Sequence, residues 1–153
     1  MSNKLPKGNQ INTNDIIIDD GSRAYNIKNK RGEILGKFIF IPSDMNIIDR
    51  YKHAVETFDK LQDKIKNESE DADVIKLKNE CEKEIEKEID YLFRADASGT
   101  FFTITTPFTP LESGELFVES VLNAVRLIIE KETGKRLERA KSRASKYTER
   151  YHK

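Results

Sequence analysis

The sequence is poor in the residues that most covalent and metal chemistry requires. Its 153 residues include one cysteine, no tryptophan and only two histidines. Because a single cysteine cannot close an internal disulfide, a reducing compartment such as the cytoplasm is expected. No apolar run approaches the roughly eighteen residues of a membrane helix, and the polar start differs from a secretion signal. The sequence therefore predicts a protein that contacts no membrane.

Charge is abundant but segregated along the chain. The net charge is zero, yet residues 44–90 hold 15 acidic and 9 basic side chains, whereas residues 131–153 hold 3 acidic and 9 basic ones. A chain of this length is expected to form one domain around one core. We predict a flexible arm over residues 1–13, a single domain over 14–134 and a basic tail over 135–153.

The first part of the predicted domain, residues 14–42, has the pattern of a three-stranded β meander. A β-branched run over residues 15–19 precedes Asp20-Gly21, a dipeptide suited to a tight hairpin turn. Residues 24–28 are the expected return strand, and a second turn at 29–32 leads to a third strand over 34–41, with Ile34, Phe38 and Phe40 on one face. Because a small sheet is marginal alone, it should pack on the helices that follow.

The second part, residues 43–134, is predicted to be helical. Apolar residues recur every three or four positions from Ile47 to Ile65 and from Val74 to Phe93, which predicts two helices joined by the polar turn 67–73. A third and more apolar helix should end at Thr133-Gly134 and form the centre of the core.

Two stretches of the chain allow alternatives. The third helix begins either at the capping box Thr109–Glu112 or one turn later, near Ser113-Gly114. The uncharged segment 100–108 is either an extra strand or an ordered loop whose phenylalanines fill the core. The basic tail is expected to be helical. The predicted fold class is thus α+β, mainly α, with a three-stranded β meander, a three-helix bundle and a helical tail.

The residue pattern predicts no enzyme, metal or cofactor. His53 and His152 lack the spacing of metal ligands, and surface positions are expected for both. Cys81 falls in the apolar stripe of the second helix, where core packing is expected. The carboxylates between Glu80 and Asp90 point in separate directions around a helix and cannot converge on one ion.

The basic tail is the one feature that suggests nucleic acid. Its arginines and lysines are interleaved with Tyr147 and Tyr151. Neither a recognition helix nor an aromatic RNA-binding sheet accompanies it, so nucleic-acid binding is the weakest of three functional hypotheses.

Several short motifs follow one another in an order that suggests a family. Phe38-Ile39-Phe40-Ile41-Pro42-Ser43-Asp44 leads into Ile48-Asp49-Arg50-Tyr51, and later motifs are Cys81-Glu82-Lys83-Glu84-Ile85, Ile89-Asp90-Tyr91-Leu92-Phe93, the small-residue loop Ala97-Ser98-Gly99-Thr100, Lys146-Tyr147 and Arg150-Tyr151. Across residues 15–151 this order resembles the tail assembly chaperones of long-tailed bacteriophages and prophages of Gram-positive bacteria.

The resemblance implies a non-enzymatic helper in the host cell cytoplasm that binds the tape measure protein and recruits tail tube subunits. Self-association is compatible with it. This sequence departs from the family pattern directly after Phe93, where a glycine is expected and Arg94 stands. The second hypothesis is a virion structural component, such as a connector or head-associated protein, whose oppositely charged ends pair between neighbours in a ring.

If the chain binds a protein partner, the first helix is the predicted interface. Its stripe lies beside charged residues and includes the aromatic types that anchor interfaces. Tyr51, Phe58 and Leu61 are therefore the predicted partner-binding residues. The third helix is expected to stabilise the fold instead, since its apolar residues spread around more than one face.

Overall fold

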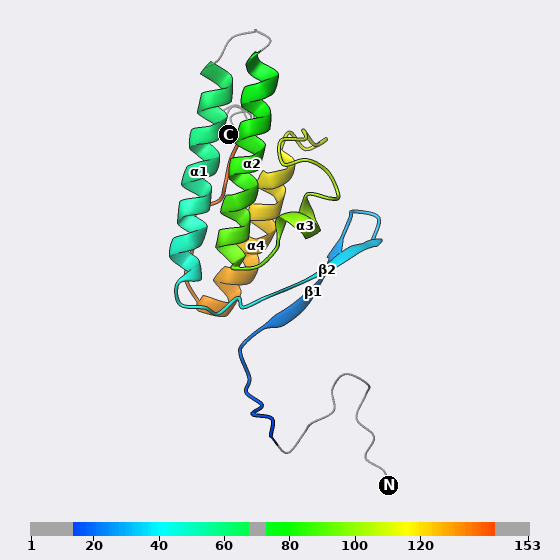
Figure 1. The fold of residues 1–153 in the computed structure, drawn as a ribbon, viewed down its shortest axis with the longest axis vertical. Helices are drawn as coiled ribbons and strands as arrows, with labels where there is room; N and C mark the ends of the chain where they lie inside the picture. Colours follow the sequence, from blue (N-terminus) through cyan, green and yellow to red (C-terminus); the bar gives the residue numbers. More distant parts are fainter. Residues whose placement is uncertain (1–13, 68–72, 143–153) are drawn as a thin grey trace.

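The computed structural model describes residues 14–67 and 73–142. These residues form a mixed α+β fold, about half helical, with a two-stranded antiparallel sheet and four helices. Figure 1 shows α1 and α2 as a long pair, α4 packed against that pair, and the hairpin projecting from the α3 side. Within the described ranges, none of the helices combines the length and the hydrophobicity needed to cross a lipid bilayer.

The sheet is a hairpin of β1 (Arg23–Lys28) and β2 (Ile34–Phe40). As predicted, the connection turns at residues 29–32, where the Asn29 carboxamide oxygen accepts hydrogen bonds from the amides of Arg31 and Glu33, each at 3.0 Å. Phe38 and Phe40 are buried. Ile34, expected on the same face, is exposed because the register shifts next to Lys28.

The prediction of a third strand over residues 15–19 is wrong. In the described part of the chain these residues do not form a strand, and Ile16, Ile17 and Ile18 are exposed. The physical reason lies in the connection, because Asp19 and Asp20 each accept a hydrogen bond from the amide two residues on, at 2.9 Å. These local bonds replace the predicted hairpin turn.

Helices α1 (Ile47–Asn67) and α2 (Asp73–Phe93) confirm the two predicted stripes. The predicted turn between them falls largely outside the described residues. Arg50 fastens the start of α1 to the end of α2, since its guanidinium donates to the Leu92 carbonyl at 2.9 Å and to the Asp44 carboxylate at 2.8 Å. The buried Arg50 side chain therefore has a structural role.

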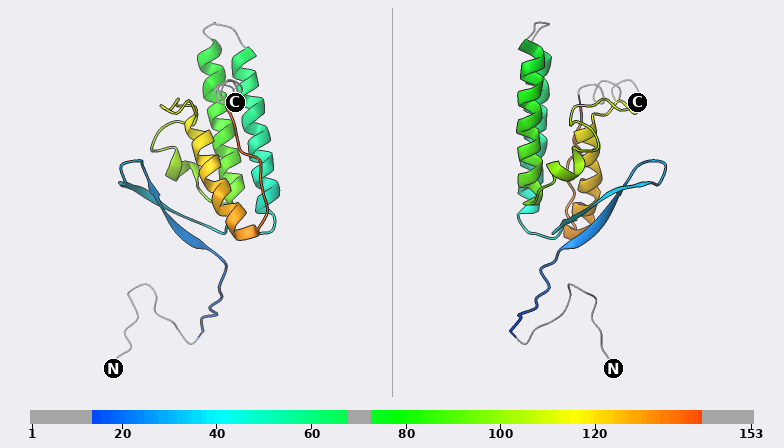
Figure 2. Two further views of the ribbon diagram at one scale, coloured as in Figure 1. Left: turned by 180° about the vertical axis from the view of Figure 1, so that it is seen from behind. Right: turned by 45° about the vertical axis from the view of Figure 1, so that its right-hand side comes forward.

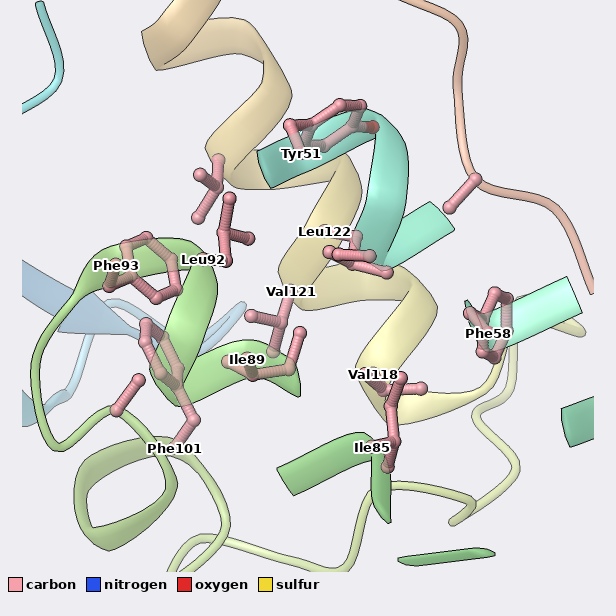
Figure 3. Close-up of a cluster of buried hydrophobic side chains, with 14 of the residues drawn as sticks. Tyr51, Phe58, Ile85, Ile89, Leu92, Phe93, Phe101, Val118, Val121 and Leu122 are labelled. Atoms are coloured by element: carbon pink, nitrogen blue, oxygen red, sulfur yellow. The ribbon is translucent and has the colours of Figure 1, made fainter. Parts of the chain in front are cut away.

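Helix α4 (Phe117–Thr133) is the centre of the core, as predicted, and ends at Gly134 with φ +72°. It begins later than either predicted start. A compact loop precedes it, in which Gly114 has φ +90° and Pro110 pairs with Leu116. Figure 3 shows side chains of α1, α2 and α4 meeting in one cluster. The labelled members are Tyr51, Phe58, Ile85, Ile89, Leu92, Phe93, Phe101, Val118, Val121 and Leu122.

The ambiguous segment 100–108 is an ordered loop rather than a strand. It contains the end of the short helix α3 (Ser98–Phe101) followed by turns, and Phe101 and Phe108 are buried. Phe101 joins an aromatic cluster in which Phe93 meets Phe38 and Phe40 edge-on, with ring centroids 4.7 and 4.9 Å apart. This cluster attaches the hairpin to α2 and α3.

Arg94 occupies a backbone conformation that glycine favours. Its φ is +54°, the one positive value at a non-glycine position among the described residues. The Arg94 amide donates to Tyr91 at 3.2 Å and the Ala95 amide to Asp90 at 3.2 Å, which is the Schellman pattern at the end of α2. The family glycine expected directly after Phe93 would therefore fit this position.

Replacing Arg94 with glycine should stabilise the protein. A left-handed residue with a Cβ costs about 1 kcal/mol more than glycine, so the free energy of unfolding of Arg94→Gly should rise by about that amount. Urea denaturation followed by circular dichroism measures it. Arg94→Ala, which keeps the Cβ, is the matched control; equal stability of both variants would contradict the backbone explanation.

Candidate partner-binding groove

The structure places the predicted partner-binding residues inside the protein. Tyr51, Phe58 and Leu61 are 1%, 1% and 3% exposed and belong to the core. The reasoning that assigned them to an interface required apolar surface left over after core packing, and α4 together with the C-terminal segment leaves none. Burial raises the pKa of the Tyr51 hydroxyl to about 12.

A segment of the chain itself covers these residues. Residues 135–142, here named the C-terminal strap, leave the end of α4 and run back beside α1 and α4 (Figure 2). The prediction of a helix is wrong for this part of the tail, because the strap has no helical residues. Residues 143–153 lie outside the described residues.

The strap is held mainly through its own backbone. The Ala140 amide donates to the side-chain oxygen of Asn123 at 2.9 Å, and the Asn123 side-chain nitrogen donates to the Ala140 carbonyl at 3.0 Å. One buried side chain thus satisfies both main-chain groups of one residue, as a neighbouring β-strand would. These hydrogen bonds use the main chain of residue 140, and the full burial of its methyl group limits this position to a small side chain.

Three further side chains of the helices bind the strap main chain. The Leu137 amide donates to the Glu130 carboxylate at 2.7 Å. The Tyr51 hydroxyl donates to the Glu138 carbonyl at 3.1 Å, and the Gln62 amide nitrogen donates to the Lys141 carbonyl at 3.4 Å. Side chains of α1 and α4 therefore line a seat for an extended peptide, and this seat is the candidate site.

The strap contributes few side chains to the core. Leu137 and Ala140 are its buried apolar residues. A groove remains between the strap and α1, and its α1 side is lined by Val55, Glu56 and Phe58. The Arg139 guanidinium pairs with the Glu115 carboxylate at 3.3 Å at the rim.

The structure describes some of the residues for which the sequence predicted no catalytic or metal-binding role. Cys81 is buried, as predicted, and burial raises the pKa of its thiol. The His53 ring lies at the surface and contacts the Glu88 carboxylate. His152 lies outside the described residues. Over residues 14–67 and 73–142, no group of three metal-ligating side chains converges.

Sequence reasoning missed the residues that build the seat. Gln62 and Asn123 are polar yet 9% and 8% exposed. Asn123 interrupts the most apolar helix of the chain, between Leu122 and Val125. A buried amide needs hydrogen-bond partners, so an asparagine inside an apolar stripe is the signal that could have predicted a main-chain contact. Comparison with protein-family models, curated proteins and solved structures finds no match to this chain.

The burial of Phe58 predicts a stability effect comparable with that of the α4 core. Removing its ring should lower the free energy of unfolding by about 3–5 kcal/mol, and Leu122→Ala should cost about 2–5 kcal/mol. Thermal melts of Phe58→Ala and Leu122→Ala test this. A Phe58→Ala melt that coincides with the unmodified protein would show that the ring is not part of the core.

Acid should loosen the strap. The hydrogen bond from the Leu137 amide lowers the pKa of the Glu130 carboxyl, and the Arg126 guanidinium lowers it further. Because the folded-state pKa is depressed, the stabilising contribution is present above the ordinary value of about 4.5 and is lost as the pH falls through the folded value.

Nuclear magnetic resonance can follow this titration directly. The Leu137 amide proton should shift as the pH falls below about 4.5. In Glu130→Gln the acidic titration should vanish from that resonance. A Leu137 amide that titrates identically in both proteins would show that another group causes the shift.

Proposed function

We propose that this chain is a non-enzymatic tail assembly chaperone that binds the tape measure protein of a long-tailed phage or prophage and recruits tail tube subunits in the host cell cytoplasm. The phage assignment rests on the order of short motifs across residues 15–151. Arg94 stands where the resemblance predicts a glycine, and its left-handed backbone is the conformation in which many helices of any family end.

One observation carries the partner-binding part of the proposal. The body of the protein holds an extended polypeptide, its own strap, by main-chain groups that every partner also has. We therefore place the partner site beneath the strap. A segment of the tape measure protein takes the place of residues 135–142 and pairs with Asn123 in the same way.

Replacement of the strap is energetically feasible because the strap has weak anchors. Its buried apolar residues, Leu137 and Ala140, are of moderate and small size. A partner segment that also fills the groove beside Val55 and Phe58 buries more apolar surface than the strap does, at about 25 cal/mol per Å². Displacement also exposes Tyr51 and Phe58, the residues that the sequence assigned to the interface, to the incoming segment.

Co-expression with the tape measure protein tests the proposal. Affinity capture of the tagged chain should recover a soluble complex of the two proteins. Asn123→Ala removes the same two main-chain hydrogen bonds from the strap and from a partner segment that takes its place, so capture by exchange should change little. Leu137→Asp should increase capture because it weakens only the competing strap.

A matched control separates these effects from loss of folding. Asn79→Ala makes the same change at an exposed position of α2 and should leave capture unchanged. If Leu137→Asp fails to raise capture, the strap does not compete with the partner. If the two proteins never co-purify, the chaperone function itself is rejected.

The virion-component hypothesis keeps one supporting observation, the exposed isoleucines ahead of β1. Mass spectrometry of purified particles distinguishes it from the chaperone function. A chaperone should be absent from finished particles, whereas a connector should be present in stoichiometric amounts. The nucleic-acid hypothesis concerns a tail whose larger part lies outside the described residues.

A further inference from the structure

The segment ahead of the hairpin has a strand-like sequence but is not one of the two strands of the sheet. Residues 15–19, here named the isoleucine segment, carry Ile16, Ile17 and Ile18 with 90%, 65% and 76% of their surface exposed. Figure 1 shows this blue segment leaving the hairpin and running away from the body. Three adjacent β-branched residues in water favour pairing with a sheet edge.

The hairpin offers an edge that fits this segment. Within the described residues the sheet contains two strands, so no strand lies on the outer side of β1. Both faces of the hairpin carry apolar side chains, since Phe38 faces the core while Leu35 and Ile39 are exposed. Because successive side chains of a strand point to opposite faces, a strand with consecutive isoleucines extends both apolar faces of the hairpin. A strand that is apolar on one face extends only one of them.

Charge favours the same pairing. The isoleucine segment and its connection carry Asp15, Asp19 and Asp20. The hairpin is basic, with five basic residues against one acidic residue. Arg23 already pairs with Glu132 and Arg31 with Glu33, so the attraction rests on Lys28, Lys30 and Lys37. An acidic strand beside this basic sheet is therefore attracted to it, and salt should weaken the attraction.

The connection directs the segment away from its own hairpin. The amides of Gly21 and Ser22 donate to the side chains of Asp19 and Asp20. Gly21, at the end of this connection, has the left-handed φ of +80°. The chain ahead of Gly21 thus leaves the sheet instead of folding back along β1.

We propose that the isoleucine segment of one copy pairs with the outer edge of β1 in a second copy. Exchange in both directions gives a closed dimer in which each sheet has three strands. The pairing gives the outer edge of β1 in each copy a hydrogen-bonded neighbouring strand, and it removes the isoleucines from water. This inference goes beyond the proposed function and does not depend on it.

Sedimentation velocity over a range of protein concentrations tests the dimer. The unmodified chain should dimerise, and Ile17→Asp should weaken dimerisation about tenfold or more, which corresponds to the loss of one buried isoleucine side chain. Ile75→Asp makes the same change at an exposed position of α2 and should dimerise like the unmodified chain. Unmodified protein that stays monomeric at every concentration overturns the proposal, as does equal weakening by both variants.

Cysteine cross-linking distinguishes exchange between copies from pairing within one copy. In a Cys81→Ala background, Ile17→Cys and Ala24→Cys are made in separate chains, a pair that a two-residue turn at 20–21 would place opposite each other. Oxidation of the mixture should yield a covalent dimer that contains one chain of each kind. If the mixture stays monomeric and the doubly substituted chain closes an internal disulfide at high dilution, the segment folds onto its own hairpin and the proposal fails.

Discussion

The packing of α4 against α1 and α2 is the constraint on which the rest of the structure depends. The chain is only 37% hydrophobic, so its long helices carry single apolar stripes between charged faces. A stripe that packs in the core is no longer available to a partner. When α4 and the strap cover the stripe of α1, the aromatic residues Tyr51 and Phe58 become part of the core. A partner can then bind to this stripe of α1 only if a segment that covers it moves away.

The strap is the segment whose movement is least costly. It is attached by hydrogen bonds to its main chain rather than by large side chains, and Asn123, Glu130 and Tyr51 would bind another extended peptide with the same geometry. An empty seat is also disfavoured because it would expose the apolar surface of Tyr51 and Phe58 to water, at about 25 cal/mol per Å². Exchange of one peptide for another is therefore favoured over simple opening.

Regular periodicity was sufficient to predict the helices and the hairpin. The three- and four-residue spacing of α1 and α2, the turn at residues 29–32 and the glycine at 134 each reflect a local rule that the tertiary structure obeys. The errors occur where local bonds or distant contacts compete with such a rule. Asp19 and Asp20 bind nearby amides and displace the turn at Asp20-Gly21. The strap bonds to Asn123, 17 residues earlier, and no helical periodicity reports that contact.

The sequence analysis missed the seat of the strap for a reason that bears on function. Motif searches ask which side chains could react with or hold a ligand, whereas here side chains of the helices bind a main chain. Such recognition leaves little pattern in the segment that is recognised, since both hydrogen bonds of Ala140 come from its main chain. The sequence signal lies instead in the helix that binds the segment, as a polar residue inside an apolar stripe. The same logic applies to the isoleucine segment, because a strand that pairs through its backbone needs only residues that tolerate an extended conformation and gain from burial. Both proposals thus assign recognition to the extended segments on either side of the helical body, and the helices supply the surface on which one of them is held.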